Sequence, residues 1–308
     1  MSVIEAERAV PAAAKALPEE TPLKRFLSDF FESRLAAAAL VLLALIILLA
    51  ALAPWIAPQN PYDLAQVDVM DSRIPPGGKG LGGTVFWLGT DGAGRDLGSA
   101  MLYGLRISLA VGAMSGFIAM TLGAAVGLIA AYAGGRTDTL IMRVVDLQLS
   151  FPAILIALIM IAVLGKGVDK IVVALVTVQW AYYARTVRGS ALVEGRKEYV
   201  EAARCLGFSH ARILFNHILP NCLPPLIVVV TVQTAHAIAL EATLSFLGVG
   251  LPQTEPSLGL LISNGFEYVL SGKYWISTFP GVALLLTIVA VNLVGDQLRD
   301  VLNPRLRR

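Results

Sequence analysis

Residues 107–133 read ISLAVGAMSGFIAMTLGAAVGLIAAYA, an unbroken run without a charged side chain. A helix that crosses a bilayer needs about 20 apolar residues, within a range of roughly 17–25. The run reaches beyond that range, and an ordinary soluble domain does not need so long an uncharged segment. The stretch therefore predicts a membrane-spanning helix, from which the search for further spans proceeds in both directions.

Five more uncharged runs flank this segment. They occupy residues 35–53, 147–165, 171–184, 223–240 and 274–295. All but one are long enough to span a bilayer. The run at 171–184 is short and is also consistent with a buried segment, but Trp180, Tyr182 and Tyr183 extend it with side chains typical of a membrane interface. We count it, which gives six predicted spans.

The composition agrees with a chain that lies mostly in lipid. The residues AVILMFWYC make up 56% and charged residues only 15%, whereas a soluble domain carries about 25% charged residues. The 24 basic and 22 acidic residues leave a net charge of +2, so no basic excess indicates a nucleic-acid partner. Two cysteines and three histidines are too few for a disulfide framework or a zinc cluster. We expect an all-α integral membrane protein without a metal site.

The distribution of Lys and Arg predicts the orientation. With six spans, both termini and the loop around residues 185–217 lie on one side, and that side holds most of the Lys and Arg residues. The positive-inside rule places this side in the cytoplasm. The first run is longer than the apolar region of a signal peptide, so we expect an uncleaved first span.

The chain then divides into five predicted parts. They are a cytoplasmic tail at 1–34, the first transmembrane helix at 35–53, an extracytoplasmic loop at 54–104, a core with five transmembrane helices at 105–299 and a cytoplasmic tail at 300–308. Residues 21–34 are consistent with an amphipathic helix on the membrane surface or with a helical start to the first span. The loop is rich in Pro and Gly, which are turn signals, and has too few apolar residues for a core of its own.

Residues 185–217, RTVRGSALVEGRKEYVEAARCLGFSHARILFNH, form the most informative loop. They are polar, lack proline and are far longer than a passive connector requires. A helical stripe of apolar residues runs through Val193, Tyr199, Val200, Ala203 and Leu206. Ser209 can cap a second short helix, from Arg212 to His217. Two short helices that meet at Gly207 predict a rigid platform between the fourth and fifth spans.

Two glycine-rich stretches match nucleotide-binding loops by letter only. Residues 78–83, GKGLGG, fit G-x-G-x-x-G but follow two prolines instead of a strand. Residues 89–94 have the glycine spacing of a Walker loop, but Arg95 and Asp96 stand where Lys and Ser or Thr are required. We therefore expect no ATP site in this chain.

Two polar or small-residue features lie inside the predicted spans. Gly112, Gly116, Gly123 and Gly127 repeat the G-x-x-x-G spacing, which lets helices approach closely. Packing within the bundle is favoured over pairing with another subunit. His236 lies well inside the fifth span. It is a candidate for a substrate pathway, and the alternative is a simple hydrogen bond to a neighbouring helix.

Several motifs together resemble the membrane subunits of bacterial ABC importers. One segment is similar to the EAA loop of that family, at about 194–221, and consists of Glu201-Ala202-Ala203, Gly207 and Ile218-Leu219-Pro220-Asn221. A second is similar to the signature that opens the permease core in the peptide and nickel branch, and includes Gly89, Thr90, Asp91, Gly94, Arg95, Asp96 and Arg106. Stretches at 241–259 and 295–304 also fit. The resemblance covers residues 35–308 and is greatest to dipeptide permease subunits of the C type.

The resemblance implies a six-helix type I ABC importer subunit with a cytoplasmic coupling-helix loop, in the bacterial inner membrane. It implies a heterodimer with a second homologous permease, an extracytoplasmic substrate-binding protein and two cytoplasmic ATPase subunits that hold ATP and Mg. It assigns neither a catalytic residue nor a cofactor to this chain. The residues that it assigns to ATPase coupling are Glu201, Ala202, Ala203, Gly207, Leu219 and Pro220. Glu201 could instead pair with Arg204 within its own helix.

The expected cargo is a dipeptide or another short peptide, and nickel is the alternative within the same branch. A self-sufficient secondary transporter or channel belongs to a different class and would show inverted repeats, of which we find no clear example. An integral-membrane enzyme would need clustered ionisable groups within the bilayer. Only His236 lies well inside a span, which disfavours that class.

Overall fold

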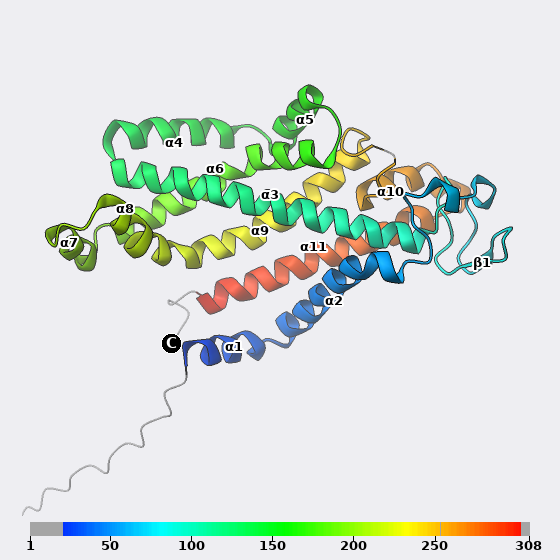
Figure 1. Ribbon diagram of the computed structural model, residues 1–308, viewed down its shortest axis with the longest axis horizontal. Coiled ribbons are helices and arrows are strands. Elements are labelled where there is room, and N and C mark those ends of the chain that lie inside the picture. The colour runs from blue at the N-terminus through cyan, green and yellow to red at the C-terminus, as the bar shows by residue number, and fades with distance from the viewer. Residues whose placement is uncertain (1–20, 253, 303–308) are drawn as a thin grey trace, which may run out of the picture.

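The computed structural model of this chain describes residues 21–252 and 254–302. The start of the predicted N-terminal tail, at 1–20, and residues 303–308 of the C-terminal tail lie outside the described residues. Figure 1 shows an elongated bundle of helices, with a two-stranded sheet at one end and two short helices at the other. We call these the β1 end and the α7 end.

Among the described residues, four helices are long and apolar enough to cross a membrane. They are α2 (Arg34–Ile56), α3 (Leu97–Ala133), the helical rod His210–Phe246, which includes α9 (Leu219–Phe246), and α11 (Trp275–Leu302). They contain four of the six predicted spans. Helix α3 has 37 residues and is about 56 Å long, so it extends beyond a hydrocarbon core of about 30 Å.

The third predicted span, at 147–165, does not form one continuous helix. The structure divides it between α4 (Gly135–Ser150) and α5 (Ala153–Leu164), which are bent by 92° at the break. Pro152 lacks a backbone N–H, and the preceding Phe151 is extended with φ −93° and ψ 143°, as expected before proline. If this bent pair is one span, the count rises to five. The prediction of six spans therefore treated each uncharged run as one helix, and the run at 147–165 is not one.

The fourth predicted span lies in a longer helix than expected. Helix α6 (Val168–Glu194) has 27 residues, or about 40 Å, and contains the whole of 171–184. It continues past Arg185 and Arg188, and for this reason it is not among the helices that are apolar enough to cross a membrane. In the half toward the α7 end, Arg188 forms a two-pronged ion pair with Asp138 of α4, both contacts being 2.6 Å. The charged half of α6 is thus held to α4.

The glycine stripe of α3 faces α6 and α9 within the bundle. A Cβ atom at Gly123 would lie 2.3 Å from the Trp180 carbonyl oxygen, and one at Gly127 would lie 2.3 Å from that of Ala184. At Gly112 it would meet Ile238 at 2.7 Å. A side chain at Gly123 or Gly127 would require movement of the backbone, and one at Gly112 would require the Ile238 side chain to move. The prediction that the stripe serves packing within the bundle is confirmed.

The segment before α3 folds against the helix ends and includes the only sheet among the described residues. It contains the 3₁₀ turns Leu64–Gln66 and Val69–Asp71 and the antiparallel strands β1 (Gly78–Lys79) and β2 (Val85–Phe86). Helix α3 begins at Leu97, so the predicted boundary at 104 falls inside a helix. At the same end, α10 (Leu258–Phe266) and the turn Val269–Ser271 connect α9 to α11.

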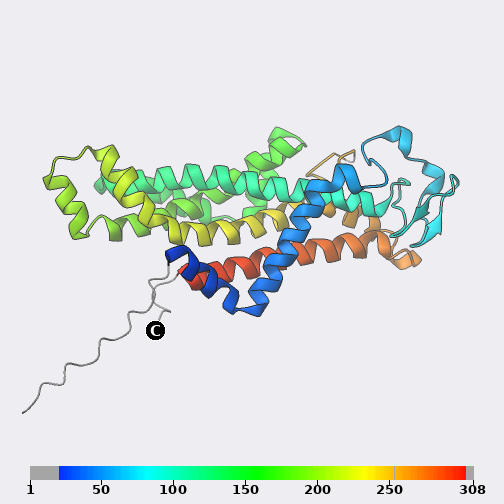
Figure 2. The ribbon, with the colours of Figure 1, turned by 60° about the horizontal axis from the view of Figure 1, so that its bottom comes forward.

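Both ends of the described chain lie toward the α7 end (Figures 1 and 2). Helix α1 (Pro22–Glu32) covers the end of α11, where Phe30 packs with Val294 and Val301. Gln297 Nε2 also donates to the Asp29 carbonyl at 3.2 Å. The helix predicted at 21–34 therefore forms and uses part of its apolar face to bind α11, while Leu27 and Phe31 remain exposed.

Candidate functional site

The platform comprises residues 195–218 at the α7 end. It contains α7 (Glu198–Cys205), α8 (His210–Arg212) and a π-helical segment, Ile213–Ile218. Val200 and Ala203 are buried in the cluster formed by α3, α6 and α9, whereas Glu201 and Ala202 are exposed. Successive residues point about 100° apart around a helix. Ala203 therefore faces the core of its own chain, and only Ala202 shares the outer face with Glu201.

The two platform helices meet at Gly207, which has φ +73°. This left-handed conformation is costly for a residue with a Cβ atom, and no neighbouring atom lies within 4 Å of the place where one would be. Backbone conformation, not crowding, therefore requires glycine here. Ser209 Oγ accepts from the Arg212 backbone N–H at 3.4 Å and caps the next helix as predicted, although that helix begins at His210 instead of Arg212.

The second platform helix continues into α9 without a break. The segment His210–Phe246 forms one helical rod of 37 residues. Pro220 cannot donate the backbone hydrogen bond of an α-helix, and the chain accommodates it next to a π-helical turn in which Leu219 N–H bonds the Leu214 carbonyl. Leu219 and Pro220 therefore lie inside a continuous helical rod and do not separate the platform from the fifth span.

Two tyrosines attach the platform to the bundle. Tyr199 of α7 donates to Glu194 Oε2 at 2.8 Å and accepts from Asn221 Nδ2 at 3.1 Å, so it joins the end of α6 to the start of α9. Partial burial and the Glu194 carboxylate raise the pKa of Tyr199 to about 12, and the phenol stays neutral at physiological pH. On the other side, the Tyr132 hydroxyl at the end of α3 bonds His210 Nδ1.

The outer face of the platform combines charge with exposed apolar surface. Leu206 is 73% exposed and Phe215 is 61% exposed. The Glu201 carboxylate makes no hydrogen bond or ion pair with any described residue. The alternative pair with Arg204 is not formed, because the Arg204 guanidinium lies over the ring of Tyr132, 6.0 Å from its centre. Large exposed apolar side chains on the same platform as a carboxylate without a partner are typical of a surface that binds another protein.

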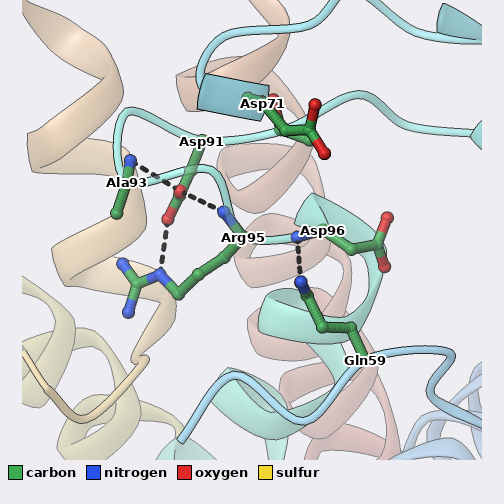
Figure 3. A network of polar contacts seen from close by, with 7 residues as sticks. Gln59, Asp71, Asp91, Ala93, Arg95 and Asp96 are labelled. Atoms are coloured by element: carbon green, nitrogen blue, oxygen red, sulfur yellow. Dashed lines mark hydrogen bonds and ion pairs between the residues drawn. The ribbon is translucent and has the colours of Figure 1, made fainter. Parts of the chain in front are cut away.

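The signature segment 89–96 forms a tightly hydrogen-bonded loop at the β1 end (Figure 3). Asp91 is 1% exposed, and its Oδ2 receives the Arg95 Nε at 2.7 Å. Its Oδ1 accepts from the backbone N–H groups of Ala93 and Arg95 at 2.8 and 3.0 Å. A Cβ atom at Gly94, which has φ +85°, would lie 2.1 Å from the Asp68 carbonyl oxygen. The carboxylate thus closes a loop that admits only glycine at position 94.

The other residues of the signature segment attach this loop to the helices. Asp96 caps α3 by accepting from Ser99 N–H at 2.7 Å, and its own N–H donates to Gln59 at 2.6 Å. The buried Thr90 hydroxyl donates to the Asp71 carbonyl at 2.6 Å, and the left-handed Gly89 packs against Trp275. Arg106 is exposed and lies further along α3, outside this loop. The segment therefore acts as a structural clamp around the start of α3.

A buried carboxylate links α9 to α3, a role that the sequence, in which Glu241 only opens the matching stretch 241–259, does not predict. Glu241 is fully buried, and its two oxygens accept from Ser108 and Ser245 hydroxyls, both at 2.8 Å. A carboxylate just after the uncharged run at 223–240 was the available signal. By contrast, His236 is exposed on α9, and the structure brings it into none of the polar clusters described above.

Comparisons with known proteins agree with this architecture. The family of binding-protein-dependent transport system inner membrane components matches residues 123–308, and the N-terminal TM domain of oligopeptide transport permease C matches residues 21–76. Two crystal forms of the MetNI methionine ABC transporter, in inward-facing conformations, share the fold. Their TM-scores are 0.54 and 0.55 at 22% identity, over 66% of this chain and 96% of theirs.

Curated relatives cover nearly the whole chain. The di/tripeptide transport system permease protein DppC of Pseudomonas aeruginosa is 36% identical over 96% of this chain and 97% of its own. The dipeptide transport system permease protein DppC of Escherichia coli K12 is 39% identical over 94% and 95%. A putative peptide transport system permease protein of Brucella suis is 44% identical over 87% of both. The chain therefore belongs to the inner-membrane components of binding-protein-dependent transport systems, a family of multi-pass membrane proteins.

Proposed function

We propose that this chain is one of two permease subunits of an ATP-driven importer for dipeptides or other short peptides. The names of the relatives support this cargo, since the Pseudomonas, Escherichia and Brucella proteins are all described as peptide permeases. The second permease is a homologous subunit, and a binding protein outside the membrane delivers the peptide. The chain itself is not catalytic, because ATP and Mg belong to two partner ATPases.

The observation that carries the coupling role is the outer face of the platform. Glu201 is exposed without a partner among the described residues, and Leu206 and Phe215 lie exposed nearby in the chain. An ATPase that binds this face would bury the two apolar side chains and supply a cation or N–H donor to Glu201. When the ATPases close, α8 would move, and the continuous rod into α9 would pass that motion to the transmembrane helices as a rigid body.

The orientation follows from the same assignment. The platform faces the cytoplasm, where the ATPases are, and the β1 end faces outward toward the binding protein. Helix α1 and the end of α11 lie toward the α7 end (Figure 1), which agrees with an arrangement in which both termini are cytoplasmic. The Lys and Arg distribution in the sequence supports the same orientation.

Uptake in a strain that lacks this gene tests the function. Labelled dipeptide and labelled nickel are supplied in parallel, and we expect the gene to restore dipeptide uptake only. A Glu201→Lys copy should insert normally and restore less than about a tenth of wild-type uptake, because it places a cation where the ATPase surface requires an acceptor. Glu32→Lys, an exposed charge reversal on α1, is the matched control and should behave as wild type.

Each outcome of this experiment separates the candidates. Restored nickel uptake without dipeptide uptake moves the chain to the metal branch while leaving the coupling mechanism intact. Normal dipeptide uptake with Glu201→Lys, at equal amounts of inserted protein, contradicts ATPase docking through Glu201. Transport by the purified chain alone, without ATPases, would instead identify a secondary transporter or channel.

A further inference from the structure

A groove of about 1120 Å³ lies between the second half of α6 and the first half of α9. The end of α4 and the end of α11 complete its walls with Leu149 and Leu302. Val228 and Val232 give the α9 wall an apolar surface, and Thr186 and Ser190 give the α6 wall hydroxyl groups. The groove has the size and the mixed lining of a site for a small organic molecule.

Two glutamines with unsatisfied amide oxygens lie next to one another between α6 and α9, and one of them, Gln233, lines this groove. Gln179 is 1% exposed and Gln233 is 8% exposed. Gln179 Nε2 donates to the Gln233 backbone carbonyl at 2.8 Å, which sets the two residues at the same level of α6 and α9. The Oε1 atom of each side chain lacks a hydrogen-bond partner among the described residues. A buried amide without a partner is costly. Gln233 lines the groove, and a bound molecule would satisfy its buried Oε1 once the side-chain amide turns toward the groove.

Two arginines line the same groove. Arg185 of α6 pairs with Asp146, but these side chains are 54% and 62% exposed, so the pair is weak and readily exchanged. Arg299 of α11 forms no ion pair with a described residue. A guanidinium binds a carboxylate through two parallel hydrogen bonds. The groove therefore offers cations for a carboxylate and, further along, an amide for N–H groups.

The spacing of these groups matches a short peptide. Arg185 lies six residues beyond Gln179 on α6, which is about 9 Å along the helix axis. An extended dipeptide spans about 7 Å and an extended tripeptide about 10 Å. We propose that the groove is the peptide-binding part of this chain's translocation pathway, in which Arg185 and Arg299 hold the peptide carboxylate and Gln233 holds its amide or ammonium N–H groups. This assignment rests on the proposed function.

The first test measures peptide uptake by the complete transporter, with the partner permease, the ATPases and the binding protein, in proteoliposomes. At a dipeptide concentration below saturation, Arg185→Gln and Gln233→Leu should each reduce uptake roughly tenfold, the loss expected from one hydrogen bond to a charged or buried group. Two variants outside the groove, Arg143→Gln and Gln148→Leu on α4, are matched controls and should stay within twofold of wild type. All four variant complexes should purify with their subunits in the wild-type ratio, which shows that the complexes assemble.

The second test asks whether the peptide occupies the groove. Gly189→Cys places a thiol on the groove wall, where a Cβ atom meets nothing within 4 Å, in a Cys205→Ser background that leaves only the buried Cys222. An anionic thiol reagent should label this cysteine, and excess dipeptide should slow the labelling at least fivefold. Leu270→Cys, at a fully exposed position, should be labelled at the same rate with and without the dipeptide.

The outcomes distinguish this proposal from the proposed function. If the wild-type transporter takes up no dipeptide, the cargo is wrong. If it takes up dipeptide while the groove variants are unaffected and the Gly189→Cys thiol is not protected, the cargo stands and the groove assignment is overturned. A Gly189→Cys thiol that is unreactive in the complete transporter also overturns it, because the groove is then covered by the partner permease.

Discussion

At the β1 end, the polar side chains of the signature segment are buried and bonded to one another, whereas at the α7 end the polar side chains of the platform are largely exposed. Asp91, Arg95 and Asp96 are all at most 7% exposed, and Asp91 alone receives three hydrogen bonds. The Glu201 carboxylate, on the platform, receives none from any described residue. The carboxylates of the signature segment therefore complete their interactions within the chain, whereas the Glu201 carboxylate is left without a partner among the described residues.

This difference indicates what each end requires from outside. The clamp at 89–96 fixes the start of α3 through contacts that the chain itself supplies. The platform is anchored on its inner face by Val200 and Ala203, but its outer face exposes Leu206 and Phe215. An end completed within the chain should respond to mutation mainly through stability, and an end completed by a partner should respond mainly through transport.

The largest expected effect is the loss of stability when the clamp at 89–96 is disrupted. Asp91→Ala removes the carboxylate that receives the Arg95 side chain and two backbone N–H groups, and it should destabilise the protein by about 3 kcal/mol. In detergent this corresponds to a fall in Tm of roughly 5–10 °C, measured by loss of the folded peak on heating. Asp169→Asn, in an exposed ion pair with Lys170, is the control and should leave Tm unchanged. An Asp91→Ala protein as stable as wild type would show that the clamp is not a structural element.

A smaller effect compares two glycines with the same backbone conformation. Gly207, on the platform, and Gly272, near the β1 end, have φ +73° and +77°, and at neither does any atom lie within 4 Å of the place where a Cβ atom would be. Alanine at either site costs about 1–2 kcal/mol of strain. We expect equal, small falls in Tm for Gly207→Ala and Gly272→Ala. Peptide uptake should fall severalfold only for Gly207→Ala, because only that turn sets the angle of α7 against α8. Equal uptake by the two variants would contradict a coupling role for the platform.

Much of the fold could be predicted from the sequence, because the thickness of the bilayer sets the length of the uncharged segments that cross it. The runs at 35–53, 107–133, 223–240 and 274–295 each lie within one long helix, apart from the first residue of the last run. The run at 147–165 does not, because charge content says nothing about a bend. Pro152 was the local signal, but proline is tolerated within many membrane helices, as at Pro224 and Pro225 of α9.

The candidate site was less accessible, because spacing identifies residues but not their partners. The motif at 201–207 located the platform and the turn at Gly207. It could not show that Ala203 faces inward, nor that Pro220 lies in a continuous rod. The tyrosines that hold the platform, Tyr132 and Tyr199, are 67 positions apart in the chain. Only the folded arrangement of α3, α7 and α9 places both of them at the platform.

The smallest expected effect tests how firmly the platform is attached. Tyr199→Phe keeps the ring but removes the bonds to Glu194 and Asn221, each worth about 1 kcal/mol. Because these bonds tie α7 to α6 and α9, the variant should hydrolyse ATP at the wild-type rate while importing about half as much peptide per ATP. Tyr274→Phe, an exposed tyrosine near the β1 end, should keep the wild-type ratio. If Tyr199→Phe also keeps that ratio, the platform is held by its apolar inner face alone, and the contrast between the two ends then rests on burial and not on hydrogen bonding.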